Sequence, residues 1–93
     1  MCKLAKSVGA ITHSDIVQAA GKMRLDLDSL MLDAVSLSAH KCYAPTGCGV
    51  LMVKDSDHLK PLLFGGSQQH RLRAGTVNVL GLVLFLKGLE YCY

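Results

Sequence analysis

The chain has 93 residues, of which 51% are hydrophobic and only 18% are charged. A single domain of this length buries only roughly 60–65% of the surface that its unfolded chain exposes, so we expect the chain to lie within a larger protein, a dimer interface or both. The formal net charge is +3, and the lysines and arginines form no continuous run, which argues against a nucleic-acid-binding protein.

The first predicted element is a helix over residues 3–7, which ends at Gly9 because a C-cap position favours the left-handed conformation. This amino-terminal segment lacks the long apolar stretch of a signal peptide. The densest apolar run, residues 79–86, is far shorter than the roughly 20 residues needed to span a bilayer. We therefore expect a cytoplasmic location and no membrane partner.

Two neighbouring strands follow. Residues 10–14 are predicted to form a buried strand whose carboxyl end delivers Asp15. Residues 16–32 are long enough for a parallel crossover, and we expect a short helix around residues 28–31. Residues 33–38 form the next strand, with apolar side chains at Ala34, Val35 and Leu37.

The second half of the chain begins with a turn at residues 44–49, which contains proline and two glycines. Residues 50–53 are predicted to return antiparallel. A glycine-rich, polar and basic loop spans residues 65–76, and Thr76 is a good N-cap for a helix over residues 77–91. Because apolar side chains surround this helix on nearly every side, we expect it to be buried.

These elements predict an α/β fold, namely part of a mixed, mostly parallel sheet with flanking helices. Four cysteines are present, and their spacing indicates neither a disulfide framework nor a zinc site. We expect all of them to be small buried hydrophobes: Cys2, Cys42, Cys48 and Cys92.

The most informative residues follow the two predicted parallel strands. Ligands of open α/β sheets bind beyond the carboxyl ends of the strands, so Asp15 should meet Ser38, His40 and Lys41 at one edge. Pyridoxal phosphate needs a lysine that forms a Schiff base with its aldehyde and a carboxylate that pairs with its ring nitrogen. Lys41 and Asp15 are the residues predicted for these two roles.

Three stretches, residues 12–22, 36–43 and 65–76, resemble in this order the cysteine desulfurases, which belong to the class V aminotransferase group of fold-type I pyridoxal phosphate enzymes. The resemblance runs from about Leu4 to Glu90. It implies that residues 1–93 are one fragment of the cofactor-binding large domain. Within it, residues 8–54 form the cofactor lysine region, residues 65–76 a dimer loop and residues 77–91 a buried helix.

The resemblance also implies residue roles. Lys41 carries the cofactor, Asp15 pairs with the pyridine nitrogen, and Gln18 hydrogen-bonds the phenolic oxygen. The phosphate contacts implied are Ser38 and His40, together with Thr76, which reaches across a homodimer interface into the partner's site. The ring-stacking residue, the upstream phosphate loop, the nucleophilic cysteine and the substrate-binding arginine of the family are not found among these residues.

The activity implied is removal of sulfur from L-cysteine, giving L-alanine and an enzyme persulfide for iron–sulfur cluster or thio-cofactor assembly, with a sulfur-acceptor protein as partner. The residues that hold the cofactor would equally suit a selenocysteine lyase or another class V enzyme acting on a related amino acid. A third alternative is a truncated, non-catalytic remnant that acts at most as a binding or dimerisation module.

Overall fold

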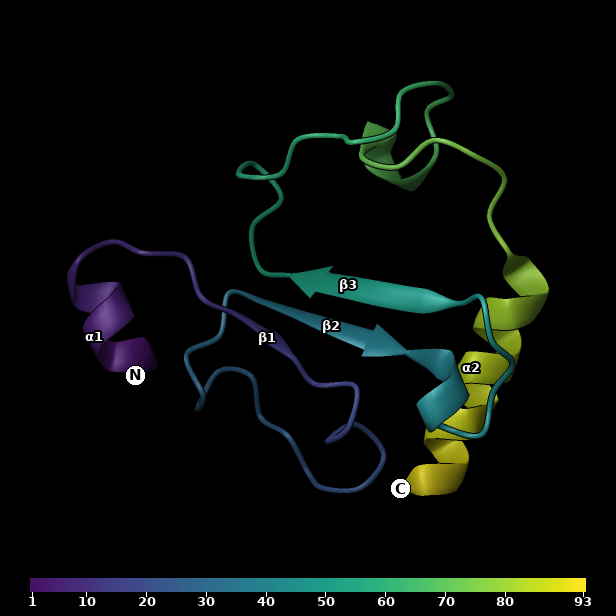
Figure 1. Ribbon diagram of the computed structural model, residues 1–93, viewed down its shortest axis with the longest axis horizontal. Helices are drawn as coiled ribbons and strands as arrows, with labels where there is room; N and C mark the ends of the chain where they lie inside the picture. Colours follow the sequence, from purple (N-terminus) through teal and green to yellow (C-terminus); the bar gives the residue numbers. More distant parts are fainter.

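The computed structural model describes residues 1–93 and has one three-stranded sheet, in the order β1-β2-β3 (Figure 1). The strands are β1 (His13–Asp15), β2 (Ala34–Ser38) and β3 (Gly49–Val53). β1 and β2 are parallel, whereas β3 returns antiparallel to β2. The α/β class and the mixed sheet expected from the sequence are therefore confirmed. The expected buried strand at residues 10–14 is wrong in its details, because β1 starts at His13, includes Asp15 and is not buried.

Helix α1 (Cys2–Ser7) precedes the sheet and ends as its sequence predicts. Gly9 has a φ of 73°, and its N–H donates to the carbonyl of Lys6 at 3.1 Å. A residue with a Cβ atom is strained in this conformation. The glycine thus turns the chain away from α1 and toward β1.

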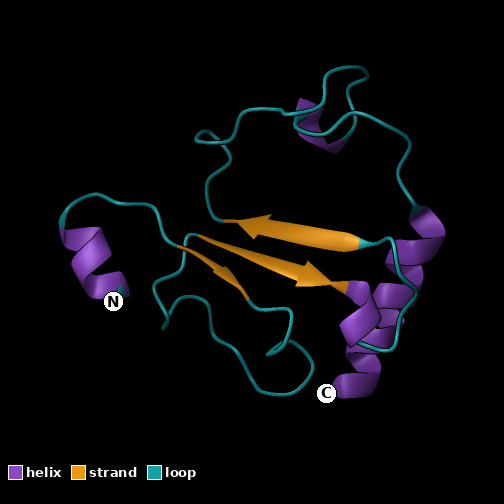
Figure 2. Cartoon of the chain, in the orientation of Figure 1, coloured by secondary structure: helices purple, strands orange, loops and turns teal.

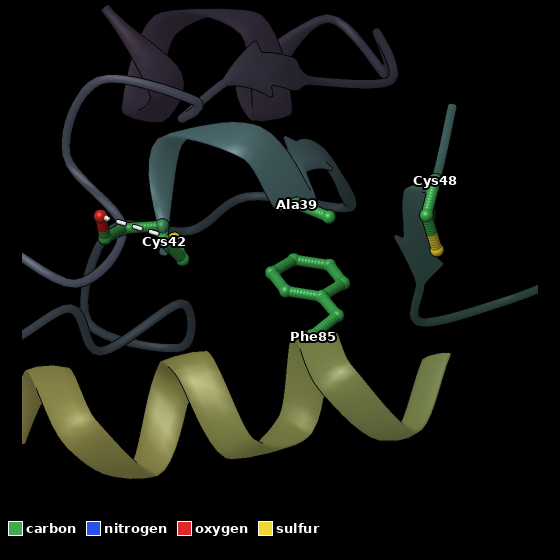
Figure 3. Close-up of a cluster of buried hydrophobic side chains, with 5 residues drawn as sticks. Ala39, Cys42, Cys48 and Phe85 are labelled. Carbon is green, nitrogen blue, oxygen red and sulfur yellow. Dashed lines mark hydrogen bonds between the residues drawn. The ribbon is translucent and has the colours of Figure 1, made fainter. Parts of the chain in front are cut away.

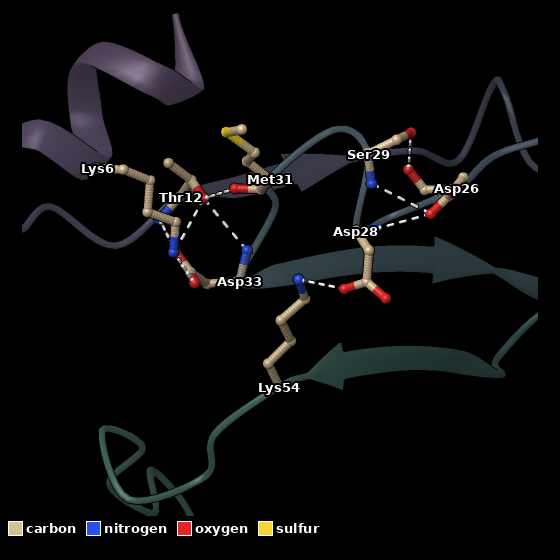
Figure 4. A network of polar contacts seen from close by, with 8 residues as sticks. All are labelled: Lys6, Thr12, Asp26, Asp28, Ser29, Met31, Asp33 and Lys54. Carbon is tan, nitrogen blue, oxygen red and sulfur yellow. Dashed lines mark hydrogen bonds and ion pairs between the residues drawn. The ribbon is translucent and has the colours of Figure 1, made fainter.

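A polar network around Thr12 and Asp33 joins the starts of β1 and β2 (Figure 4). The carboxylate of Asp33 accepts a hydrogen bond from the Thr12 N–H at 2.8 Å. It also forms an ion pair with Lys6. The Thr12 carbonyl accepts from the N–H groups of Asp33 and Ala34, both at 3.0 Å. These contacts fix the parallel register in which His13 lies opposite Ala34.

The crossover between β1 and β2 contains turns but no helix, so the expected helix at residues 28–31 is wrong. The Asp26 carboxylate accepts from the N–H groups of Asp28 and Ser29, and Met31 adopts a φ of 55°. A left-handed residue ends helical growth after one turn. Lys54, just after β3, forms an ion pair with Asp28 at 2.5 Å and ties the crossover to the sheet (Figure 4).

Only one face of the sheet is packed. Because side chains alternate along a strand, Val35, Leu37 and their β3 partners face one side, and all the apolar contacts of β2 are made there. Val35 is buried against Ile16 and Leu32 of the crossover. The opposite face carries polar side chains of β1 and β2.

Helix α2 (Val79–Cys92) packs beside the carboxyl end of β2 and the 3₁₀ turn η1 (Ala39–Lys41), as Figures 1 and 2 show. Phe85 inserts its ring between Cys42 and Cys48 beneath Ala39 (Figure 3). Burial of a phenylalanine side chain contributes about 1.5–3 kcal/mol. This residue is therefore the main apolar anchor of α2.

Two expectations for α2 are wrong. The helix starts two residues later than expected, because the Asn78 side chain accepts from the Gly81 N–H at 3.0 Å and acts as the N-cap in place of Thr76. Asparagine caps a helix at least as well as threonine. The helix is also not buried: only Gly81, Phe85 and Gly88 are inaccessible, since no second layer of the chain covers its outer side.

A long loop runs from Lys54 to Asn78 and is interrupted by the 3₁₀ turn η2 (Gln69–Arg71). Figure 1 shows this loop extending beyond β3, away from the rest of the sheet. The whole chain is a slab of 41 × 35 × 15 Å with 11 buried residues. None of its helices has the length and apolarity that crossing a bilayer requires.

Gly88 is predicted to be essential for the packing of α2. A Cβ atom on Gly88 would lie 1.9 Å from the Cys42 carbonyl oxygen, which belongs to the backbone and cannot turn away. Gly88→Ala should therefore lower the free energy of unfolding by about 1–3 kcal/mol, although alanine favours helices more than glycine. In the matched variant Gly81→Ala, the new Cβ meets only the flexible Asn78 side chain. Urea unfolding followed by circular dichroism should show the smaller loss for Gly81→Ala, and equal losses would contradict the proposed packing.

Asp33 should make the stability of the chain sensitive to acid. Its hydrogen bond with Lys6, and then those with Thr12, hold the pKa of the Asp33 carboxyl well below its usual range. This stabilisation is present above the unfolded-state pKa of about 3.9 and is lost as the pH falls through the lower folded-state pKa. Asp33→Asn should thus flatten the decline of melting temperature below about pH 4. Asp57→Asn, which removes an exposed carboxylate with no side-chain partner, should leave that decline unchanged.

Candidate functional site

Asp15 ends β1 and lies opposite Ser36 of β2. Its Oδ1 atom accepts a hydrogen bond from the Val17 N–H at 2.9 Å, which holds the side chain in a local turn. The Oδ2 atom has no partner in the chain. The exposed carboxylate therefore keeps one oxygen free to accept a hydrogen bond from another group.

Gln18 is held by a residue that the sequence reasoning did not single out. Its Oε1 atom accepts a hydrogen bond from the Lys22 ammonium at 2.9 Å. A lysine can only donate, so this contact decides the orientation of the Gln18 amide and turns its Nε2 donor outward.

Ser38 and His40 form a second polar pair at the end of β2. The Ser38 hydroxyl and the His40 Nδ1 atom are 2.8 Å apart. When the hydroxyl donates to Nδ1, the imidazole proton lies on Nε2, which is then free to donate to another group. The pair can thus offer an N–H or an O–H donor to an anion at this edge.

Lys41 lies in η1, the 3₁₀ turn that directly follows β2. The turn is anchored on buried Ala39, whose N–H donates to the Cys48 carbonyl at 3.0 Å. Lys41 itself is exposed and its amine forms no ion pair or side-chain hydrogen bond in the chain. A rigid turn therefore presents an uncommitted amine.

Asp15 and Ser38 end adjacent parallel strands, and Gln18, His40 and Lys41 follow within three residues of those ends. Asp15, Ser36 and Ser38 also share the unpacked face, because Asp15 pairs with Ser36 and Ser38 lies two residues further on. Two hollows of the chain lie elsewhere, one of about 430 Å³ at residues 63–71 and one of about 110 Å³ between the crossover and β3.

Thr76 lies far along the chain from the other predicted site residues. It is exposed, lies three residues before the start of α2 and follows the long loop. That loop carries its own hollow, lined by Phe64, Gly65 and Arg71 among others. Thr76 therefore belongs to a separate region of this chain.

Cys42, next to Lys41, is fully buried. Burial raises the pKa of the Cys42 thiol, with a further contribution from neighbouring Cys92. A raised pKa leaves less thiolate at neutral pH. Cys48 is buried as expected, whereas Cys2 and Cys92 are only half-buried, so the expectation that all four cysteines are buried is wrong for these two.

Comparison with known proteins places this chain in a family. The family model described as "Aminotransferase class-V" matches residues 1–93. The chain belongs to the class V aminotransferase family. The match includes β1, β2 and η1, the elements that carry Asp15, Ser38 and Lys41.

Individual relatives agree with the family. The chain is 46% identical over 90 residues to a cysteine desulfurase of Sinorhizobium fredii and 40% identical over 90 residues to cysteine desulfurase IscS of Dictyoglomus turgidum. Each alignment covers 97% of this chain and 23% of the relative. The chain therefore spans about a quarter of the length of these relatives.

Solved structures show the same correspondence. A NifS-like protein from Rickettsia africae superposes with a TM-score of 0.92 at 31% identity, over 98% of this chain and 25% of that one. The protein SspA, solved in complex with cysteine, superposes with a TM-score of 0.90 at 35% identity, over 97% of this chain and 26% of that one. The slab thus corresponds to part of a larger fold-type I domain.

Proposed function

We propose that this chain is the cofactor-binding segment of a pyridoxal phosphate-dependent cysteine desulfurase. The observation that carries the proposal is the edge shared by β1 and β2. There, a free carboxylate oxygen, a glutamine amide, a serine–histidine pair and an uncommitted lysine amine follow one another along the chain, in the order that the resemblance to cysteine desulfurases implies. The similarity to cysteine desulfurases over 97% of the chain supports the same activity.

The donor set fits the cofactor. Pyridoxal phosphate supplies an electron sink that lets the side-chain sulfur of an amino acid leave. Lys41 would hold its aldehyde carbon covalently and move a proton at the Nζ atom. Asp15 Oδ2 would hold the proton of the ring nitrogen, because the other oxygen is already bound to Val17.

The remaining residues would orient the group. Gln18 would donate from Nε2 to the phenolic oxygen, since its Oε1 is occupied by Lys22. The Ser38–His40 pair would bind the phosphate. The donor is the His40 Nε2–H when the Ser38 hydroxyl donates to Nδ1, and the Ser38 O–H when Nδ1 carries the imidazole proton. Thr76 would supply a further phosphate donor, and the resemblance to the family implies that it does so in the site of a second copy in a homodimer.

We further propose the substrate and setting. L-cysteine or a closely related amino acid is the substrate class, and the sulfur passes to an enzyme persulfide and then to an acceptor protein for iron–sulfur cluster or thio-cofactor assembly. The name of the Dictyoglomus turgidum relative supports this use. Four cysteines without a disulfide suit a reducing cytoplasm.

A chimera tests the role of Lys41. The 93 residues replace the matching segment of the Sinorhizobium fredii cysteine desulfurase, with which they align over 97% of their length. The chimera should bind pyridoxal phosphate with a visible absorption band, and borohydride reduction should fix the cofactor on the peptide containing Lys41. Lys41→Ala should abolish both signals, whereas Asp15→Ala should weaken cofactor binding and desulfuration.

The control is Lys60→Ala, which removes an exposed lysine outside the proposed site and should leave the band, the labelled peptide and alanine release from cysteine unchanged. Label on a different lysine would refute the assignment of Lys41. A folded chimera with intact Lys41 but no cofactor band would favour the non-catalytic remnant. Cofactor binding with release of selenium only would favour a selenocysteine lyase.

Mixing of subunits tests the role of Thr76. Loss of a hydrogen bond to a charged group costs about 1.5–3 kcal/mol, so Thr76→Val in the chimera should weaken cofactor affinity by roughly 10–150-fold. If the sites are shared, a heterodimer of Thr76→Val and Lys41→Ala subunits has one doubly defective site and one intact site. Desulfurase activity should therefore reappear on mixing. Demonstrated subunit exchange without recovery would show that Thr76 serves its own chain.

A further inference from the structure

Cys42 lies where α2 comes closest to η1. It is fully buried, and its Sγ atom lies 3.7 Å from the Ala20 carbonyl oxygen (Figure 3). The glycine at position 88 permits this approach, since a Cβ atom there would clash with the Cys42 carbonyl. The thiol is therefore held between the helix and the crossover.

A second thiol reaches the same place from α2. Cys92 follows Gly88 by four residues and so lies on the same side of the helix, one turn further on. A Cβ atom built on Gly21 would lie 2.7 Å from the Cys92 Sγ atom and 3.5 Å from the Cys42 Sγ atom. The two sulfurs thus converge on one point above Gly21.

The surrounding contacts keep the two thiols together and exclude the other cysteines. The Tyr93 hydroxyl accepts from the Gly21 N–H at 3.1 Å and donates to the Met23 carbonyl at 3.0 Å, which ties the last turn of α2 to the crossover. Cys48 lies on the other side of the Phe85 ring (Figure 3). Cys2 packs in the separate cluster around Ile16 and Val35.

We propose that Cys42 and Cys92 form a thiol–disulfide exchange site, which closes as a reversible intrachain disulfide when an oxidised low-molecular-weight thiol such as glutathione disulfide is present. This inference rests on the positions of the sulfurs and does not depend on the proposed desulfurase activity. It differs from a structural disulfide because both thiols are free in the described state.

The accessibility of the two thiols sets the order of the steps. Cys92 is half-buried and Cys42 is fully buried, so the Cys92 thiolate attacks a sulfur of glutathione disulfide and glutathione leaves as a thiolate that takes up a proton. The Cys42 thiolate then attacks the Cys92 sulfur of this mixed disulfide and expels the second glutathione. Two electrons pass to glutathione disulfide, and two protons leave the cysteines for the two glutathione thiols.

The buried position of Cys42 has a kinetic consequence. The second step needs the Cys42 thiolate, and burial raises the pKa of that thiol. Ring closure should therefore accelerate as the pH rises through and beyond the usual cysteine pKa of about 8.5. Once closed, the bond would fasten η1, the turn that carries Lys41, to the last turn of α2.

The 93-residue chain is incubated with glutathione disulfide at pH 8, quenched by acid, alkylated and mapped by mass spectrometry. The peptides that contain Cys42 and Cys92 should be linked, at least about tenfold in excess over any pairing with Cys2 or Cys48, because preset neighbours react at a high effective concentration. The same reaction in urea should spread the bonds over all four cysteines. An equal spread in buffer, or a glutathione adduct on Cys92 that never closes, would overturn the proposal.

Two variant pairs separate this site from general cysteine reactivity. Cys92→Ser should abolish the intrachain bond, whereas Cys48→Ser should leave it unchanged. Gly21→Ala should slow closure, because its Cβ would displace the Cys92 sulfur. Gly9→Ala has the same positive φ of 73° but an open environment, so it carries the same backbone strain and should not slow closure. Equal slowing by both glycine variants would show that strain, and not the position of the sulfurs, controls the reaction.

Discussion

The hydrogen-bonded pair of Thr12 and Asp33 is the constraint on which the rest of this structure depends. A three-residue strand such as β1 has few ladder hydrogen bonds of its own, so its position relative to β2 must be fixed at its start. The Thr12 backbone and side chain meet the Asp33 carboxylate and N–H there, and Lys6 adds an ion pair from α1. A slip of one residue would turn Asp15 to the packed face of the sheet and separate it from Ser38.

Packing on the opposite face of the sheet fixes the other half of the site. The Phe85 ring and the glycine backbone at position 88 bring α2 against Ala39 and Cys42, which hold both ends of η1. The turn can then present Lys41 as an exposed residue, because buried Ala39 and Cys42, and not the lysine side chain, hold the turn in place. Apolar residues on one face of the sheet therefore hold in place the polar residues on the other face.

The sequence predicted β2, β3 and the end of α1 well, because alternating apolar residues and the Gly9 cap are local signals, whereas the roles assigned to Asp15 and Lys41 stay predictions. It predicted the start of α2 poorly, since Thr76 and Asn78 are both acceptable caps and only the observed Asn78–Gly81 hydrogen bond distinguishes them. The helix expected at residues 28–31 of the crossover is absent for a similar reason. Helical growth ends at Met31, which adopts a left-handed conformation. A sequence predicts that conformation mainly at glycine, so methionine gave no signal for it.

Contacts between distant residues were beyond the reach of the sequence. Nothing in the separate stretches around Gly21, Cys42 and Cys92 indicates that two sulfurs meet there, since the meeting depends on how closely α2 approaches the crossover. The burial of α2 was overestimated for a related physical reason. A helix with apolar residues all round needs neighbours on every side, and this chain supplies a neighbour on one side only.

The sheet order described above leaves β1 and β3 as outer strands, each with one row of unpaired N–H and C=O groups. β3 is composed of Gly-Val-Leu-Met-Val, without charge or proline, and its Leu51 and Met52 side chains are about half exposed. An apolar outer strand of this kind is a template for pairing with another strand. Wherever these 93 residues are produced without a neighbour along β3, self-association through that edge competes with folding, and a lysine at Leu51 would be the natural way to suppress it.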